Sequence, residues 1–152
     1  MDIEDALDQL GRQIGIGLRL DGARACRLVF DGRTALDIEA PADRPGTVFL
    51  HSAVGLLPPT GRREAVYEML LAGNLFGRDT GRATLGIDRD LGEILLVRQL
   101  DMAETPYAAF ADAVEDCVAR ARAWTERLRQ THAETPAAAG DALALARFGL
   151  RI

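Results

Sequence analysis

Apolar residues near the start of the chain recur with the spacing of one face of an α-helix. Ile3, Leu7, Leu10 and Ile14 follow one another at intervals of four, three and four residues. Acidic residues fill the first turn, where a carboxylate stabilises the positive end of the helix dipole. The pattern predicts an amphipathic helix that ends at the glycines following Ile14.

The next three segments carry the pattern of β-strands. Residues 25–30 and 34–40 alternate apolar and polar side chains, and Asp31-Gly32 between them is a strong short-turn signal. These two segments are predicted to form a β-hairpin. Residues 47–54 form a third strand that is apolar on both faces. One of its faces should meet helices, and the other should meet either a partner or a second layer of the same domain.

The second half of the chain again contains segments with helical spacing and segments with strand spacing. A helix is predicted over residues 62–75, strands over 84–88 and 93–100, and a long helix from Thr105. The last helix keeps a three-four spacing of apolar residues: Tyr107, Phe110, Val114, Cys117, Ala121, Trp124 and Leu128. The order is α-β-β-β-α-β-β-α. Because only one strand-to-strand link contains a helix, the pattern favours an α+β fold, a twisted antiparallel sheet with three helices.

Residues 1–130 are predicted to form the domain, and residues 131–152 a flexible C-terminal tail. The tail is rich in alanine and is interrupted by Pro136 and Gly140. Its last apolar residues, Phe148, Leu150 and Ile152, alternate as a short strand would. Two interpretations stand side by side: a disordered end, or an end that docks on the protein's own binding groove or on a neighbouring molecule.

Composition narrows the class of protein. The chain has 152 residues, suits one domain and carries a net charge of −5. A nucleic acid requires clustered cations, so it is not an expected partner. Cys26 and Cys117 lie in apolar periodic segments without a CxxC or metal spacing, which predicts buried free thiols. With neither a secretory signal nor an apolar run of membrane-spanning length, we expect a cytoplasmic protein that does not insert into membranes.

Catalytic motifs are missing from the sequence. His51 and His132 are the only histidines and lie far apart, which disfavours a metal site or a nucleophile activated by histidine. The chain contains neither a phosphate-binding GxxxxGK[ST] loop nor a GxSxG turn. We therefore predict no enzyme activity, no catalytic or metal site and no cofactor.

Three motifs resemble the Tir chaperone (CesT-like) family of class I type III secretion chaperones. Residues 70–77, LLAGNLFG, are similar to the family's LL-x-AN-x-x-G signature, although Gly73 replaces the usual alanine before the asparagine. Residues 80–96 resemble G-x-x-LG-D-x-x-x-G-x-x-L, and residues 28–31 match L-x-FD. Each motif is weak alone, but their order and spacing together are more specific. The likeness spans residues 3 to 130.

The resemblance implies a homodimer that binds the N-terminal segment of secreted effector proteins in the bacterial cytoplasm. Such a chaperone keeps its cargo, the bound effector segment, extended and soluble and delivers it to the secretion apparatus. The ATPase of that apparatus is a further candidate partner. A regulator that sequesters a transcription or secretion regulator would use the same grooves. A small-molecule-binding α+β domain is the alternative from another class, and it would need a concave polar pocket.

For the dimer contact, the resemblance points to the second helix and the strand after it: Val66, Met69, Leu70, Gly73, Leu75, Phe76, Leu85 and Ile87. The competing interpretation is a core stripe, because four of the helical residues share one face and a helix must bury one face on its own sheet. Leu71 and Phe76 fall outside that stripe. This apolar excess favours an interface.

For the cargo, the candidates lie in the first helix and the first three strands: Leu7, Leu10, Ile14, Ile16, Leu18, Leu28, Phe30, Leu36 and Phe49. Ile16 and Leu18 extend the apolar spacing beyond the helix into a segment with too few partners to bury every side chain. Which of these residues belong to the core and which to a binding surface stays open at the level of sequence.

Overall fold

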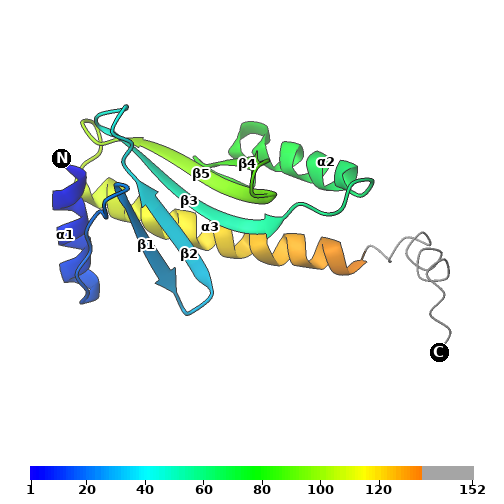
Figure 1. The fold of residues 1–152 in the computed structure, drawn as a ribbon, viewed down its shortest axis with the longest axis horizontal. Coiled ribbons are helices and arrows are strands. Elements are labelled where there is room, and N and C mark those ends of the chain that lie inside the picture. The colour runs from blue at the N-terminus through cyan, green and yellow to red at the C-terminus, as the bar shows by residue number, and fades with distance from the viewer. Residues whose placement is uncertain (135–152) are drawn as a thin grey trace.

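A computed structural model describes residues 1–134, and its elements follow one another in the predicted order (Figure 1). Their bounds are α1 (Ile3–Ile14), β1 (Ala25–Phe30), β2 (Thr34–Glu39), β3 (Thr47–Leu56), α2 (Arg63–Asn74), the short 3-10 helix η1 (Leu75–Gly77), β4 (Thr84–Asp88), β5 (Glu93–Asp101) and α3 (Tyr107–Glu134). All neighbouring strands pair antiparallel. The predicted α+β fold is confirmed.

The five strands form one sheet in the order β1-β2-β3-β5-β4. β3 and β5 are the longest strands and lie at its centre, whereas β1 and β4 are its edges. The connection through α2 and η1 carries the chain past the position of β5 to the far edge, and β5 then returns between β4 and β3. This crossover is the one strand-to-strand link that contains a helix.

The turn of the first hairpin requires left-handed backbone. Asp31 and Gly32 have φ values of 51° and 64°, and both residues tolerate this conformation better than most. The resulting register pairs Cys26 with Ile38, and both are buried on the same face of the sheet. The predicted hairpin is therefore confirmed.

The helices cover one face of the sheet, with α3 crossing it, α1 at one end and α2 at the other (Figure 1). Buried side chains form two hydrophobic clusters. The first joins α1, β1 and β2 to the first half of α3 around Leu36 and Phe110. The second joins α2 and β4 to the second half of α3 around Trp124. β3, β5 and α3 contribute to both clusters and hold them together.

The other face of the sheet has no covering layer among residues 1–134. On β3, Val48 and Leu50 are buried under the helices, whereas Phe49, His51 and Ala53 point the other way and remain partly or fully exposed. The second face of β3 was predicted to meet either a partner or a second layer of the domain. Residues 1–134 do not provide that second layer.

The apolar stripe of α3 is buried from Phe110 to Leu128 as predicted, and Cys26 and Cys117 are buried free thiols. The helix begins just after Pro106 and runs to Glu134, four residues beyond the predicted end of the domain at residue 130. Residues 135–152, including the apolar residues predicted to dock, lie outside the described part. No helix within residues 1–134 is both long and apolar enough to cross a membrane.

Candidate binding surfaces

Side chains of α2 divide between the protein's own core and its surface. Val66, Leu70 and Gly73 are buried, and with Leu85 of β4 they belong to the second cluster or border it. Met69 is half-buried against the same cluster. These five members of the predicted dimer contact thus have partners within the chain, and their role in a dimer stays a prediction.

The outer side of α2 carries an exposed apolar ridge. Tyr67 and Leu71 are spaced four residues apart, so they line one side of α2, and Leu75 and Phe76 follow in η1. Leu71 is 71% exposed and Phe76 is 90% exposed. We call these four residues the α2 ridge. Leu75 and Phe76 belong to the predicted dimer contact, as does the partly exposed Ile87 on edge strand β4. Tyr67 and Leu71 were not among the predicted contact residues, although their four-residue apolar spacing in the sequence could have identified them.

Phe76 combines an exposed aromatic ring with a left-handed backbone. Its φ and ψ are 54° and 22°, a conformation that costs a residue with a Cβ about 1–2 kcal/mol. Strained backbone that presents an apolar ring to solvent is typical of a functional position. The geometry of η1 therefore favours a contact role for Phe76 over a packing role.

Two neighbouring residues of the signature have structural partners. A Cβ at Gly73 would lie 2.5 Å from the ring of Trp124, so only glycine lets α3 bury this indole under α2. The Asn74 amide donates to the Leu85 carbonyl (3.1 Å) and accepts from the Leu85 N–H (2.8 Å). It therefore replaces a missing strand neighbour of β4. The Trp124 ring therefore explains why position 73 holds glycine and not the usual alanine.

The loop after η1 is fastened to α3 as well. The indole N–H of Trp124 donates to the Asp79 carbonyl at 3.1 Å. Arg127 donates to the Asp79 carboxylate at 3.0 Å, and its guanidinium lies 4.8 Å from the centre of the Trp124 ring. Because both contacts join the loop to a buried tryptophan, the α2 ridge has a firm support.

Five of the predicted cargo residues lie in the first hydrophobic cluster, where the chain itself covers them: Leu7, Leu10, Leu18, Leu28 and Leu36. Phe30 and Phe49 are half-buried. Ile14 and Ile16 are 45% and 53% exposed, so they are the predicted cargo residues that present the most apolar surface. None of the nine is tested as a cargo contact, and these two are the most accessible to a partner.

The end of α1 explains why Leu18 is buried while Ile14 and Ile16 are not. Gly15 adopts φ 79°, and the N–H groups of Gly15 and Ile16 both donate to the Gly11 carbonyl. A Cβ at Gly11 would lie 2.4 Å from the Ile16 carbonyl oxygen, so the chain turns back tightly across the helix there. That reversal directs Leu18 into the core and leaves the two isoleucines outside.

The uncovered face of the sheet is largely polar. His51 lies 3.1 Å from the Glu39 carboxylate, and Arg27 donates to both oxygens of Asp37 on the neighbouring strand. These exposed pairs stabilise cross-strand neighbours only weakly. A face with paired charges is a less suitable place for apolar cargo than the α1 end.

The titratable groups of residues 1–134 show no reactive arrangement. Burial raises the pKa of Cys117 to about 11, so its thiol stays uncharged at neutral pH and is a poor nucleophile. Within residues 1–134, no cluster of three or more histidine, cysteine or acidic side chains could hold a metal ion. The candidate binding features of the described surface are its exposed apolar side chains.

One antiparallel sheet with helices on one face and apolar side chains left on its helical surface is the architecture of a small protein-binding domain. The sequence pattern of the Tir chaperone protein (CesT) family matches residues 5–125, from the first turn of α1 into α3. The match includes all five strands. The chain belongs to the Tir chaperone (CesT) family.

Individual proteins agree with this assignment. The Chlamydia pneumoniae protein CPj0713/CpB0740 is 31% identical over 91 residues, which are 60% of this chain and 68% of that protein. The fold is similar to the HopA1–SchA chaperone–effector complex at a TM-score of 0.67 and 20% identity, covering 82% of this chain and 93% of the other. It is also similar to the heterodimeric ExoU–SpcU complex from the type III secretion system of Pseudomonas aeruginosa (TM-score 0.60, 22% identity, 84% and 94% covered).

Proposed function

We propose that this chain is a dimeric chaperone that binds the N-terminal segment of one or more type III secreted effector proteins in the bacterial cytoplasm. It keeps that segment soluble and secretion-competent and delivers it to the secretion apparatus, whose ATPase is a candidate partner. The family match over residues 5–125 carries the proposal. The likeness to a chain solved in a chaperone–effector complex, and to one solved in a heterodimeric complex of a type III secretion system, supports it. The work is binding, and we propose neither catalysis nor a cofactor.

The cargo contact is proposed at the α1 end of the molecule. Ile14 and Ile16 expose apolar surface there. Among residues 1–134, edge strand β1 pairs with β2 alone, and beyond Ala25, whose N–H and carbonyl both bond to Asp21, its outer edge is open to a partner strand. An extended partner gains main-chain hydrogen bonds along such an edge and selectivity from apolar contacts beside it. Spreading contacts over a long segment offsets the entropy lost when a flexible chain is ordered.

The dimer contact is proposed at the α2 ridge, with Ile87 beside it on β4. Exposed large apolar side chains concentrated on one helix mark an interaction site more often than a solvated face. Aromatic residues such as Tyr67 and Phe76 are enriched at the centres of interfaces. Because Val66 and Leu70 already anchor α2 from below, the ridge can be buried by a second copy without repacking the core.

Affinity purification of the tagged chain from its native cytoplasm tests the cargo role. The expected product is a larger secreted protein, identified by mass spectrometry, whose N-terminal segment resists limited proteolysis in the complex. A chain with Ile14→Asp and Ile16→Asp should lose this protein and keep its own fold. Leu91→Asp is the matched control, because Leu91 is 69% exposed in the β4–β5 turn, away from the α1 end.

Three outcomes would contradict the cargo proposal. Recovery of a transcription or secretion regulator in place of an effector would favour the sequestering function. Recovery of small metabolites alone would favour a ligand-binding domain. An effector retained equally by the double variant and by the Leu91→Asp control would move the cargo contact away from Ile14 and Ile16.

A further inference from the structure

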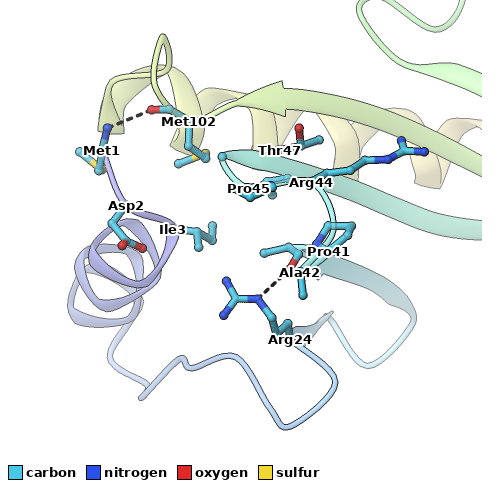
Figure 2. A pocket seen from close by; sticks show the side chains of 13 residues that line it. Met1, Asp2, Ile3, Arg24, Pro41, Ala42, Arg44, Pro45, Thr47 and Met102 are labelled. Carbon is cyan, nitrogen blue, oxygen red and sulfur yellow. Dashed lines mark hydrogen bonds between the residues drawn. The ribbon is translucent and has the colours of Figure 1, made fainter.

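A hollow lies between the start of α1 and the loop that joins β2 to β3, and the dimer and cargo contacts proposed above do not use it (Figure 2). Its volume is about 350 Å³. Ile3, Ala40, Val48 and Met102 line it and are each less than one-tenth exposed. The hollow therefore has an apolar floor, large enough for one or two side chains of a partner.

Arg24 brings a positive charge to this hollow. Its guanidinium points into the space between α1 and the loop (Figure 2). Nε donates to the Ala40 carbonyl at 2.8 Å, and the terminal nitrogens have no hydrogen-bond or ion-pair partner among residues 1–134. The donors of the guanidinium fork that match a carboxylate are thus available.

The backbone holds Arg24 in place at a cost. Its φ is 57°, in the left-handed region that disfavours residues with a Cβ. Its N–H donates to the Asp21 carbonyl at 2.9 Å, and its carbonyl accepts from the Ala40 N–H at 3.0 Å. With the Nε bond, three hydrogen bonds therefore fix the direction of one exposed arginine. Such preorganisation lowers the entropy lost when a ligand binds.

The Met1 ammonium at the hollow donates to the Met102 carbonyl at 2.9 Å, and the other charged side chains there leave this role to Arg24. The guanidinium of Arg44 lies 5.8 Å from the centre of the Phe49 ring and points away from the hollow (Figure 2). Asp2 accepts the Glu4 N–H at 2.9 Å and caps α1. Its carboxylate forms no ion pair with Arg24 within residues 1–134.

We propose that this hollow is a subsite for an acidic residue next to an apolar residue in a bound partner segment. The carboxylate binds the free nitrogens of Arg24, and the neighbouring apolar side chain rests on the floor. Arg24 directly precedes edge strand β1, so the hollow lies next to the start of that strand. The inference rests on the proposed chaperone function and assigns Arg24 as a residue that selects the cargo sequence.

Nuclear magnetic resonance of the full chain with two short probes tests the subsite. The probes are acetyl-Ile-Glu-Ile-amide and acetyl-Ile-Gln-Ile-amide. The Glu probe should shift the backbone amide signals of the non-proline residues between 40 and 47 in a saturable way. The Gln probe should bind roughly tenfold more weakly, because it lacks the charge-assisted bond. Arg24→Gln should weaken the Glu probe by a similar factor, and Arg44→Gln should not.

The comparison of the two probes uses the unaltered chain, so it decides the matter even where Arg24→Gln disturbs the local backbone. Equal affinity for both probes, or shifts confined to other residues, overturns the subsite. Sodium acetate that displaces the Glu probe at equal concentration would show a site for small carboxylates and would also overturn it.

If an effector binds Arg24→Gln as tightly as the natural chain, the subsite fails and the chaperone function stands. If the natural chain recovers no effector, the chaperone function fails, and the probes still decide the hollow.

Discussion

Gly73 stands where α2 passes closest to α3, and it links a family motif to one packing contact. The ring of Trp124 occupies the space that any larger side chain at position 73 would need. Trp124 in turn holds the loop at Asp79 through its N–H. The exposed residues that follow, Leu75 and Phe76, are therefore positioned by a buried neighbour that lies about 50 residues away in sequence.

Gly73→Ala should destabilise the domain by about 1–3 kcal/mol, because the new methyl group overpacks the Trp124 ring. Urea unfolding followed by tryptophan fluorescence measures the change. Gly86→Ala is the matched control, since a Cβ at Gly86 meets nothing within 4 Å, and its effect should stay within about 0.5 kcal/mol. Equal effects of the two substitutions would contradict the packing explanation.

The buried thiol of Cys117 should make the folding stability of the domain depend on pH in the alkaline range. Burial raises its pKa to about 11 from 9.0, the ordinary value of an accessible thiol. The neutral thiol is favoured in the folded protein, so its contribution to folding stability is complete at pH values below the pKa of the unfolded chain. That contribution is lost as the pH rises towards the higher pKa of the folded protein. Between pH 8 and pH 10.5 the free energy of unfolding should fall by about 2 kcal/mol through this thiol. Urea midpoints at both pH values measure the fall.

Cys117→Ala isolates the contribution of this thiol to the pH dependence. The variant loses some packing at every pH, but its stability should fall less than that of the natural chain between the two pH values. The groups other than Cys117 titrate in both proteins and cancel in the comparison. An identical pH dependence of the two proteins would show that the thiol does not carry the effect.

Among the elements, α2 has the least usual surface, because it is apolar on two sides. Val66 and Leu70 meet the sheet and α3, whereas Tyr67 and Leu71 form part of the α2 ridge. A helix with one buried face needs only the first pair. The second pair is an element-scale reason to propose a protein partner.

Leu70 and Leu71 form a matched pair for testing that reasoning. Leu70→Asp buries an unpaired charge in the core, so it should unfold the domain, because stabilities of whole domains are only about 5–15 kcal/mol. Leu71→Asp places the same charge on the exposed ridge and should leave a folded monomer. Circular dichroism measures the fold and light scattering the mass. A dimer that survives Leu71→Asp would exclude Leu71 from the contact.

Periodicity in the sequence predicted the helices and strands well and their environments less completely. The stripe of α3 is continuous, so its burial could be predicted from spacing alone. Leu18 could not be assigned, because its burial depends on a chain reversal that needs Gly11 and Gly15. The residues of α2 could not be divided either, since both sides are apolar and Trp124, which decides the inner side, is remote in sequence.

Arg24 shows the same limit at the hollow. Nothing in its local sequence distinguishes it from the other arginines. Its role depends on the approach of Ala40, which follows β2, and of α1 from the start of the chain. A subsite assembled from three separate segments is visible only once the topology is known.

At the scale of the whole molecule, the two hydrophobic clusters separate the two proposed contacts. The first cluster lies beneath the α1 end, where we propose the cargo, and the second beneath the α2 ridge, where we propose the second copy. β3, β5 and α3 run through both clusters. This arrangement lets one chain hold a partner at each end without competition between them.

Folding of the chain should be coupled to its assembly. If the α2 ridge forms a dimer, the folded state is stabilised by association, and its urea midpoint must rise with protein concentration. A hundredfold increase, from 1 to 100 μM, should stabilise the dimer by about 2.7 kcal/mol, the free energy of that concentration ratio. Leu71→Asp should show a midpoint that does not depend on concentration, whereas the double variant Ile14→Asp with Ile16→Asp should keep the dependence of the natural chain. A flat midpoint for the natural chain, with a mass near 16.4 kDa at 100 μM, would contradict the dimer contact at the α2 ridge.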